Sequence, residues 1–428
     1  MLAFFHWNTS AQFQLGPEGD SSYFVEMTQY FYIHESPSMH YPTMHSRRIL
    51  GPFLAAKISS CTDLITGANP GKPFRYDYYG NDLSTNPPSD HLPTYHRIVG
   101  AWQLLDSAAF LAIVLGLFGV LQVLQDRQRT PHWQPIWLTL ILCCSPTLGR
   151  LYFNWPMMND LIGISLGILS LLSLLKGRAI LSGILLGAGM LARENLALIY
   201  PCFIWIIFAW EQNSIRPSSR KTPLLTHFIL AFAPFLLLCA FPVFRNLSPL
   251  HDATSGIRGT SVGATHDYLA EILFHLRRPF TAEYGILRQS VVYWHVCGPL
   301  LFLALRFYPW TRHQLKQDAL LWVALLFVVG TAFYVDRYVV YAVFPLLLLS
   351  RHCLGTRISP FTAGCVSLFY LEAVLFRLKN GIGDNLQIEF TDVPSLKWSA
   401  LLGAAALLLI ILEPILRTRL VPLQTKAA

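Results

Sequence analysis

The polar residues most able to do chemistry in this chain are carboxylates and arginines that stand beside long apolar runs. Near the start, Glu18 and Asp20 lie two residues apart in the stretch 17–23, which contains a glycine and favours a turn. A carboxylate there can act as the general base on a hydroxyl group or hold a divalent cation. An ordinary solvated acidic turn is the alternative interpretation.

A pair of arginines opens the next apolar stretch. Arg47 and Arg48 precede a run, starting at Ile49, that is typical of an apolar helix lying in the plane of a membrane interface. The planar guanidinium fork suits phosphate oxygens, so both arginines are candidate phosphate ligands. The alternative is that they simply extend towards lipid headgroups.

Three ionisable residues flank the middle apolar runs. Asp160 stands at a predicted helix N-terminus, where an aspartate is favoured for structural reasons and where it is also a candidate ligand of an acceptor or a metal ion. Arg193 and Glu194 are adjacent at the end of a short run, and ionisable residues at membrane depth suggest function. On a helix these two side chains point about 100° apart, so they need not pair with each other. A plain turn between helices is the alternative.

The last motif is Asp336-Arg337-Tyr338, between two late apolar runs. Arg337 is a candidate ligand of a lipid-linked phosphate, with Tyr338 at the membrane interface. The alternative is a tight turn with an ion pair inside an interfacial aromatic belt.

The elements that must position these residues are apolar helices. Of the 428 residues, 53% are hydrophobic and only 13% are charged, against about a quarter charged in soluble domains. A bilayer core about 30 Å thick requires apolar runs near 20 residues, and lipid favours helices because they satisfy their own backbone. The sequence therefore predicts an all-α fold, a polytopic transmembrane bundle of about eleven spans. The runs are 99–124, 135–150, 159–175, 179–192, 195–210, 224–243, 291–308, 318–334, 338–350, 358–376 and 398–416.

Basic residues in the short loops predict the orientation. If the spans alternate, these residues all fall on one side, which is then the cytoplasm. They are Arg127, Arg129, Lys176, Arg178, Arg216, Arg220, Lys221, Arg312, Lys316, Arg351, Arg357, Arg417, Arg419 and Lys426. The prediction is an outer segment, 1–98, carrying the acidic motif and interfacial helices, and a transmembrane domain, 99–428, with an outer loop at 244–290. The formal charge of +8 then reflects topology and lipid headgroups, and no nucleic-acid partner is expected.

Taken together, these motifs resemble the GT-C superfamily of multi-spanning glycosyltransferases, which use polyprenyl-phosphate sugar donors. The resemblance combines the acidic motif in a long first outer loop, the arginines before an interfacial helix, the middle spans and the late acidic-Arg-Tyr turn. It covers most of the chain in layout but only short motifs in sequence. The matching residues are Glu18 and Asp20, Arg47 and Arg48, the stretch from Asn159-Asp160 through Lys176-Gly177-Arg178 to Arg193-Glu194, and Asp336-Arg337-Tyr338 with Pro345.

The resemblance implies that this multi-pass protein transfers a sugar directly to an acceptor hydroxyl at the outer face of its membrane, which is expected to be a bacterial inner membrane. Asp20, with Glu18 the weaker candidate, would be the catalytic base. Arg47, Arg48, Arg193 or Arg337 would stabilise the leaving phosphate. A divalent cation, Mg or Mn, would be a possible cofactor. Family members normally have a span before the acidic loop, so we expect an in-frame extension encoding one.

Two other functions fit parts of the sequence. A lipid-linked polysaccharide polymerase or ligase typically carries its key arginines in a large late outer loop, and segment 244–290 contains several. A secondary transporter would show internal repeats, broken helices and ionisable residues near the midplane, whereas here the charges stand mostly at the outer ends of the runs and the sequence shows no repeat. For the glycosyltransferase hypothesis, the expected partners are the lipid-linked sugar donor and membrane lipids. The sequence identifies neither the sugar nor the acceptor.

Overall fold

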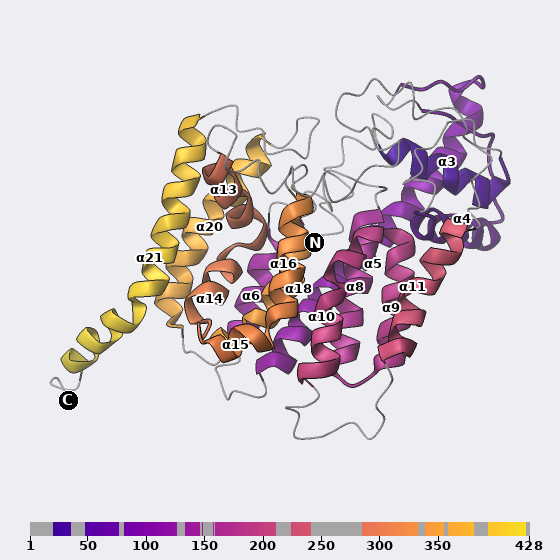
Figure 1. Ribbon diagram of the computed structural model, residues 1–428. Helices are drawn as coiled ribbons and strands as arrows, with labels where there is room; N and C mark the ends of the chain where they lie inside the picture. Colours follow the sequence, from indigo (N-terminus) through magenta and orange to yellow (C-terminus); the bar gives the residue numbers. More distant parts are fainter. Residues whose placement is uncertain are drawn as a thin grey trace. The chain divides into compact units, whose positions relative to one another are not determined.

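The protein is helical throughout the part of the chain that the computed structural model describes (Figure 1). Those residues are 20–35, 48–76, 81–125, 133–145, 148, 157, 159–210, 224–240, 285–332, 339–354, 358–380 and 393–424. Within them, the β-structure amounts to one isolated antiparallel bridge between Tyr76 and Asp82. The prediction of an all-α fold is confirmed.

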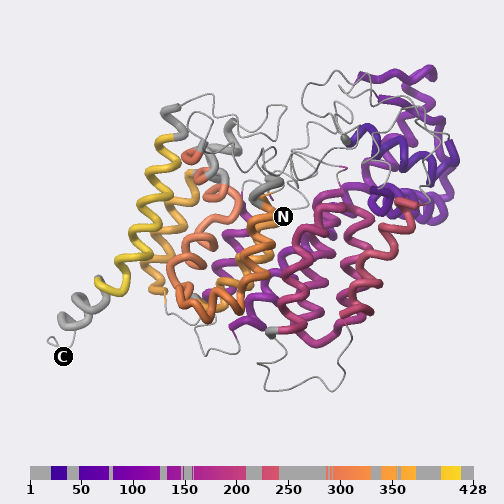
Figure 2. The backbone as a smooth tube through the Cα atoms, viewed as in Figure 1, coloured from indigo at the N-terminus to yellow at the C-terminus, as the bar shows by residue number. Residues whose placement is uncertain are grey.

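The chain divides into two compact units. Unit 1 comprises Met1–Gly116, Arg150–Ala197 and Ser219–Tyr268, and unit 2 comprises Leu117–Gly149, Leu198–Ser218 and Leu269–Ala428. Unit 1 contains α3 (Asp20–Ile33), α4 (Leu50–Thr66), most of α5 (Pro88–Gln125), α8 (Asn159–Leu175), α9 (Ala179–Ala192) and α11 (Leu224–Ala240). The tube in Figure 2 shows α8, α9 and α11 side by side, in magenta to rose.

Glycines allow α9 and α11 to approach closely. A Cβ atom added at Gly187 would lie 2.4 Å from the carbonyl oxygen of Leu230, and one added at Gly183 would lie 2.8 Å from the Cβ of Leu230. Small residues four positions apart are a common way for helices to pack in lipid, where backbone contact replaces a hydrophobic driving force. Gly183 and Gly187 therefore let the short helix α9 pack closely against the backbone of α11.

A buried chain of polar side chains crosses the same three helices. Ser170 on α8 lies 2.9 Å, Oγ to Oγ, from Ser182 on α9, whose Oγ is 3.0 Å from Nε2 of His227 on α11. All three residues have no exposed surface. Hydrogen bonds between polar side chains of this kind fix the register of apolar helices.

The N-terminal part of unit 1 is held together by polar contacts to α3. Thr28 Oγ1 accepts a hydrogen bond of 3.1 Å from the indole N–H of Trp102 on α5. Gln29 is bonded twice to the backbone of Phe74, donating to its carbonyl and accepting from its N–H, each at 2.9 Å. These contacts fasten α3 to both the following loop and α5.

Helix α4 has an unusual distribution of side chains. Its buried residues are all small: Gly51, Pro52, Ala55, Ala56 and Ser59. Its large apolar residues point outward, with Phe53 41%, Leu64 86% and Ile65 84% exposed. Lys57 lies among them, its Nζ 5.4 Å from the centre of the Phe53 ring. The distribution is the reverse of that expected for a helix covering a core in water, and it suits a helix that touches lipid.

Unit 2 holds the remaining helices. They are α6 (Trp133–Cys143), α10 (Tyr200–Trp205), α13 (Gly285–Cys297), α14 (Pro299–Phe307), α15 (Arg312–Gln317), α16 (Ala319–Ala332), α18 (Val343–Leu349), α19 (Arg351–Leu354), α20 (Pro360–Asn380) and α21 (Val393–Gln424).

One polar node ties several of these helices together at Asp318, between α15 and α16. Its carboxylate accepts hydrogen bonds from Nη2 of Arg351, at 2.6 and 2.8 Å, from the indole of Trp205 and from the Gln314 amide. The Arg351 guanidinium also lies over the Trp205 ring, 4.6 Å from its centre. Asp318 has no exposed surface, so its charge is matched by donors from three segments.

Every predicted apolar run contains helical structure, but three of the runs are not single α-helices. The run 291–308 is broken at Gly298, which has φ +50 between α13 and α14. The run 195–210 passes from the 3₁₀-helix η2 (Glu194–Ile199) through α10 to a π-helical turn at Ile206–Trp210. A 3₁₀ turn, η5 (Val340–Ala342), opens the run 338–350. The sequence pattern did not predict these interruptions.

Two described helices are long and apolar enough to cross a membrane: Pro88–Gln125 and Lys397–Ile415. Helix α5 begins at Pro88, well ahead of the predicted start of the first span at 99. Seven further apolar helices among the described residues are 10–17 residues long. Membrane association therefore has support, and a count of about eleven spans stays a prediction.

Candidate functional site

Two buried arginines and two carboxylates meet in unit 1 where α4 and α8 begin and α9 ends. The first pair joins Arg48, just before α4, to Glu194, just after α9. Nε of Arg48 donates to Oε2 of Glu194 at 2.9 Å, and Nη2 donates to Oε1. The arginine side chain is 1% exposed and the glutamate 21%. The bidentate geometry is the one in which a guanidinium binds an oxyanion most specifically.

The second pair joins Arg193, at the C-cap of α9, to Asp160 in the first turn of α8. Nε of Arg193 lies 2.9 Å from Oδ1 of Asp160, and both side chains are almost wholly buried, at 0% and 1% exposed. Space for the arginine comes from Gly163, one turn along α8, since a Cβ atom there would lie 2.7 Å from the Cβ of Arg193. The glycine thus places the guanidinium against the start of α8.

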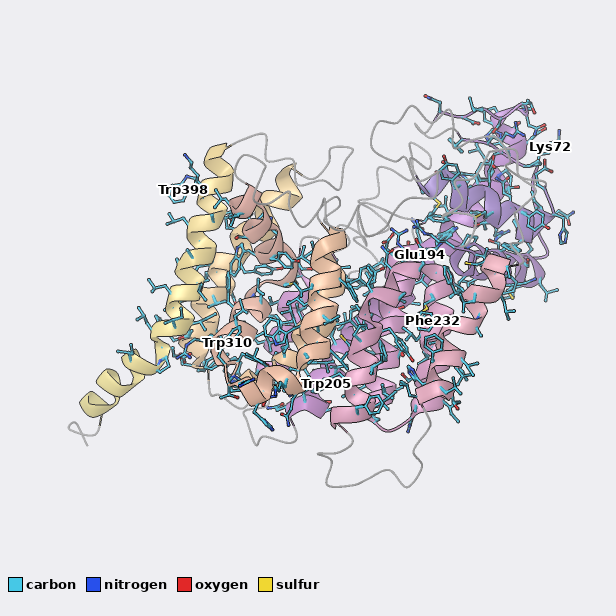
Figure 3. All side chains as sticks on the ribbon, in the orientation of Figure 1. Lys72, Glu194, Trp205, Phe232, Trp310 and Trp398 are labelled. Atoms are coloured by element: carbon cyan, nitrogen blue, oxygen red, sulfur yellow. The ribbon has the colours of Figure 1, made fainter. Side chains whose placement is uncertain are left out.

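Asn159 connects the two pairs. Its side-chain amide donates to the carbonyl oxygen of Arg48 at 2.8 Å, which fixes the chain at the start of α4 against the start of α8. Gly51 makes this approach possible, because a Cβ atom there would lie 1.9 Å from Oδ1 of Asn159 and 2.6 Å from the ring of Trp102. We call Arg48, Asp160, Arg193 and Glu194 the charge cluster. Figure 3 labels Glu194 at the end of α9 nearest to α4.

Asp106 on α5 is a third carboxyl group at this end of the unit, and the sequence analysis did not select it. It has no exposed surface. Its Oδ2 accepts a hydrogen bond of 3.3 Å from the backbone N–H of Met157, just before α8. Met157 is buried and has φ +63, a conformation that non-glycine residues rarely adopt. The signal for Asp106 was present, since it is a lone carboxyl group inside the predicted span 99–124.

The candidate residues from the sequence analysis have mixed outcomes. Asp160 and Arg193 come together, as do Arg48 and Glu194, and the expectation that Arg193 and Glu194 need not pair agrees with their separate partners. An apolar helix does follow Arg48.

Of the acidic motif in 17–23, the structure describes the residues from Asp20 onward. The stretch 17–23 was expected to be a turn, but Asp20 is the first residue of α3, so that expectation was wrong from residue 20 onward. Glu18, Arg47 and Arg337 lie outside the described residues, as does most of the loop 244–290. The roles that the resemblance implies for Asp20 and Arg337 would require both residues to lie beside the cluster, and this placement stays a prediction.

The proposed metal-binding role of Asp160 and Glu194 finds no support in this geometry. Each carboxylate faces a guanidinium group, which neutralises the charge that would attract a divalent cation. Among the described residues, no group of three or more His, Cys, Asp or Glu side chains is arranged to hold a metal ion. In the described structure the cluster consists of two buried ion pairs, each joining one arginine to one carboxylate.

Comparison of the chain with protein-family models gave no match, and comparison with curated proteins also gave none.

Proposed function

We propose that this protein is a multi-pass membrane glycosyltransferase that transfers a sugar from a polyprenyl-phosphate donor to an acceptor hydroxyl at the outer membrane face. The proposal includes the predicted bundle of about eleven spans, with the outer segment, 1–98, above it. It rests on the GT-C resemblance together with one observation, the charge cluster. Two arginines buried among apolar helices are costly to maintain, and such residues in membrane proteins usually mark a functional site.

The cluster has the chemistry to recognise a phosphate. Both arginines already bind oxyanions of similar geometry, namely the carboxylates of Glu194 and Asp160. A donor phosphate would exchange with one of these carboxylates, so a guanidinium changes its anionic partner and stays paired. The Glu194 side chain is the more accessible of the two carboxylates, at 21% exposed, and Arg48 is therefore the arginine that we expect to engage first.

In the proposed reaction the acceptor oxygen attacks the anomeric carbon of the donor. A glycosidic bond forms, the bond between that carbon and the phosphate oxygen breaks, and the lipid phosphate leaves with the bonding electrons. Asp20 takes the proton of the acceptor hydroxyl, and the arginines stabilise the negative charge of the leaving phosphate. Asp20 opens α3, which is fastened to α5 through Thr28 and Trp102.

The test uses the full-length protein reconstituted in lipid vesicles with a panel of polyprenyl-phosphate sugars. Asp20→Asn keeps the shape of the side chain and removes the base, so transfer should fall by about 10²- to 10⁴-fold. Asp90→Asn is the matched control, because Asp90 is a surface residue paired with Lys72. Protein amounts in the vesicles are equalised first. No transfer from any donor by the unaltered protein, or near-normal transfer by Asp20→Asn, would contradict the proposal.

Secondary transport is the second candidate, and the helix breaks favour it. The chain unwinds at Gly298 between α13 and α14, and η2 replaces an α-helical turn beside Arg193. Broken helices beside buried charges are typical of transporter binding sites. Uptake of a labelled solute into vesicles, without any covalent product, would favour this function. The polymerase or ligase alternative depends on the arginines of 244–290, which lie almost entirely outside the described residues.

A further inference from the structure

Asp106 is a buried carboxyl group that neither ion pair of the charge cluster uses. It lies inside the apolar helix α5 with no exposed surface. Its Oδ2 accepts from the N–H of Met157, and its Oδ1 has no hydrogen-bond partner. A wholly buried carboxylate with one long hydrogen bond and no cationic partner would be very costly.

Asp106 differs from the nearby carboxylates Asp160 and Glu194, each of which is paired with an arginine. On α8, Asp160 is paired with Arg193 from the end of α9, and Arg48 before α4 is paired with Glu194. The two guanidinium groups are therefore matched by two carboxylates. Helix α3 adds another buried carboxyl group, Glu26, and no additional positive charge. Among the described residues at this end of the unit, an ionised Asp106 would therefore add one more negative charge beside two ion pairs that are already balanced.

The partner of Asp106 connects it to the cluster. Met157 has a left-handed backbone conformation, φ +63, immediately before α8 begins with Asn159 and Asp160. Strained backbone of this kind persists only where its surroundings hold it. The bond from the Met157 N–H to Asp106 is the polar contact that the structure gives to this residue's amide. Asp106 thereby helps to set the position from which Asp160 reaches Arg193.

We propose that Asp106 is a positioning residue that carries a proton at neutral pH, holding the Met157 turn through a neutral carboxyl group and sparing the charge cluster a net negative charge. The part of this inference that concerns donor binding rests on the proposed function. A neutral Asp106 lets an anionic phosphate approach arginines whose charges are balanced. Loss of its proton in alkali adds a negative charge beside them, so phosphate binding weakens as pH rises.

The protonation state is tested by infrared spectroscopy of the purified full-length protein at neutral pH. The carbonyl stretch of a protonated carboxylic acid is separate from the bands of a carboxylate. The spectrum of the unaltered protein minus that of Asp106→Asn should contain the protonated-acid band, and the matched difference for the surface control Asp90→Asn should contain carboxylate bands instead. If Asp106→Asn does not fold, ¹³C-aspartate in the unaltered protein should move the band. Absence of a protonated aspartic acid would overturn the proposal.

The positioning role is tested by binding of a short polyprenyl phosphate from neutral to alkaline pH. The unaltered protein should lose affinity as pH rises, and Asp106→Asn, which is neutral at every pH, should keep its affinity. An equal loss in both proteins would overturn the role assigned to Asp106. If no polyprenyl phosphate binds at any pH while the protonated-acid band is present, the proposed function fails and the assignment of Asp106 stands.

Discussion

The Arg193–Asp160 pair is the more deeply buried of the two ion pairs in the charge cluster. We consider a double-mutant cycle with Arg193→Met, Asp160→Leu and the double variant. Each single change leaves the opposite charge buried without its partner, since the two side chains are 0% and 1% exposed. Loss of one partner from a buried pair destabilises by about 3–5 kcal/mol, whereas removal of both charges is often nearly neutral.

Two single effects of about 3–5 kcal/mol with a nearly neutral double variant would give a coupling of about 6–10 kcal/mol. We therefore expect the coupling between Arg193 and Asp160 to reach or exceed about 3 kcal/mol, the upper end of the range for contacting residues. Methionine keeps the part of the side chain that packs against Gly163, so a packing defect does not imitate the loss of charge. The Arg48–Glu194 pair provides the internal comparison. Water reaches Glu194, which is 21% exposed, so the same cycle there should give a smaller coupling.

The assay is unfolding of the purified protein by sodium dodecyl sulfate in mixed micelles, followed by tryptophan fluorescence and near-ultraviolet circular dichroism. Both probes must give the same transition for the free energies to be compared. Single-variant effects that add within about 0.5 kcal/mol in the double variant would refute the coupling. Equal coupling energies for the two pairs would refute the argument from burial.

Three further predictions concern the N-terminal part of unit 1. Burial, followed by the hydrogen bond to the Asp63 carboxylate, raises the pKa of Tyr32 well above its ordinary value of 10.0. The stability that the protonated Tyr32 contributes is fully present below that ordinary value and is lost as pH rises towards the folded-state pKa. Tyr32→Phe should therefore remove this alkaline loss from unfolding curves and lower the free energy of unfolding by about 1 kcal/mol at neutral pH. Gly51→Ala should destabilise by about 1–3 kcal/mol, because its Cβ would meet two packed side chains, whereas Gly100→Ala, which has open space, should not destabilise; similar melting temperatures for both variants would contradict this. Cys61 is exposed on α4, so a membrane-impermeant maleimide should label it on intact cells but not after Cys61→Ser; labelling that appears only on lysis would place this segment inside.

The positions of the helices were largely predictable, because an apolar run near 20 residues leaves few alternatives for the backbone. The breaks within the runs were not predicted. Gly298 is one glycine among many. It has φ +50, and a Cβ atom there would lie 3.0 Å from the Tyr370 ring and 3.1 Å from Ile141, residues that are distant in the sequence. The periodicity of a sequence reflects only its local composition. It therefore does not distinguish a glycine that interrupts a helix, such as Gly298, from one inside a continuous helix.

The candidate site was predictable in its residue types and only partly in its pairings. Adjacency on a helix indicated that Arg193 and Glu194 diverge, but it could not identify Asp160 and Arg48 as their partners. Those pairings arise from the close approach of α4, α8 and α9 at Gly51 and Gly163, which has no local signature. Asp106 was not among the predicted residues, which stand at the ends of the apolar runs, although a carboxyl group within a run is the stronger anomaly.

The outward-facing apolar side chains of α4 bear on any attempt to engineer this protein. Replacing Leu64 and Ile65 by lysine or glutamate would be the usual first step in making the segment soluble, because both are more than four-fifths exposed. If this face touches lipid, those substitutions would improve behaviour in water and release the helix from the bilayer at the same time. A crystal structure of such a variant would then show α4 without its lipid contacts. Lipid nanodiscs would preserve the native contact surface of α4.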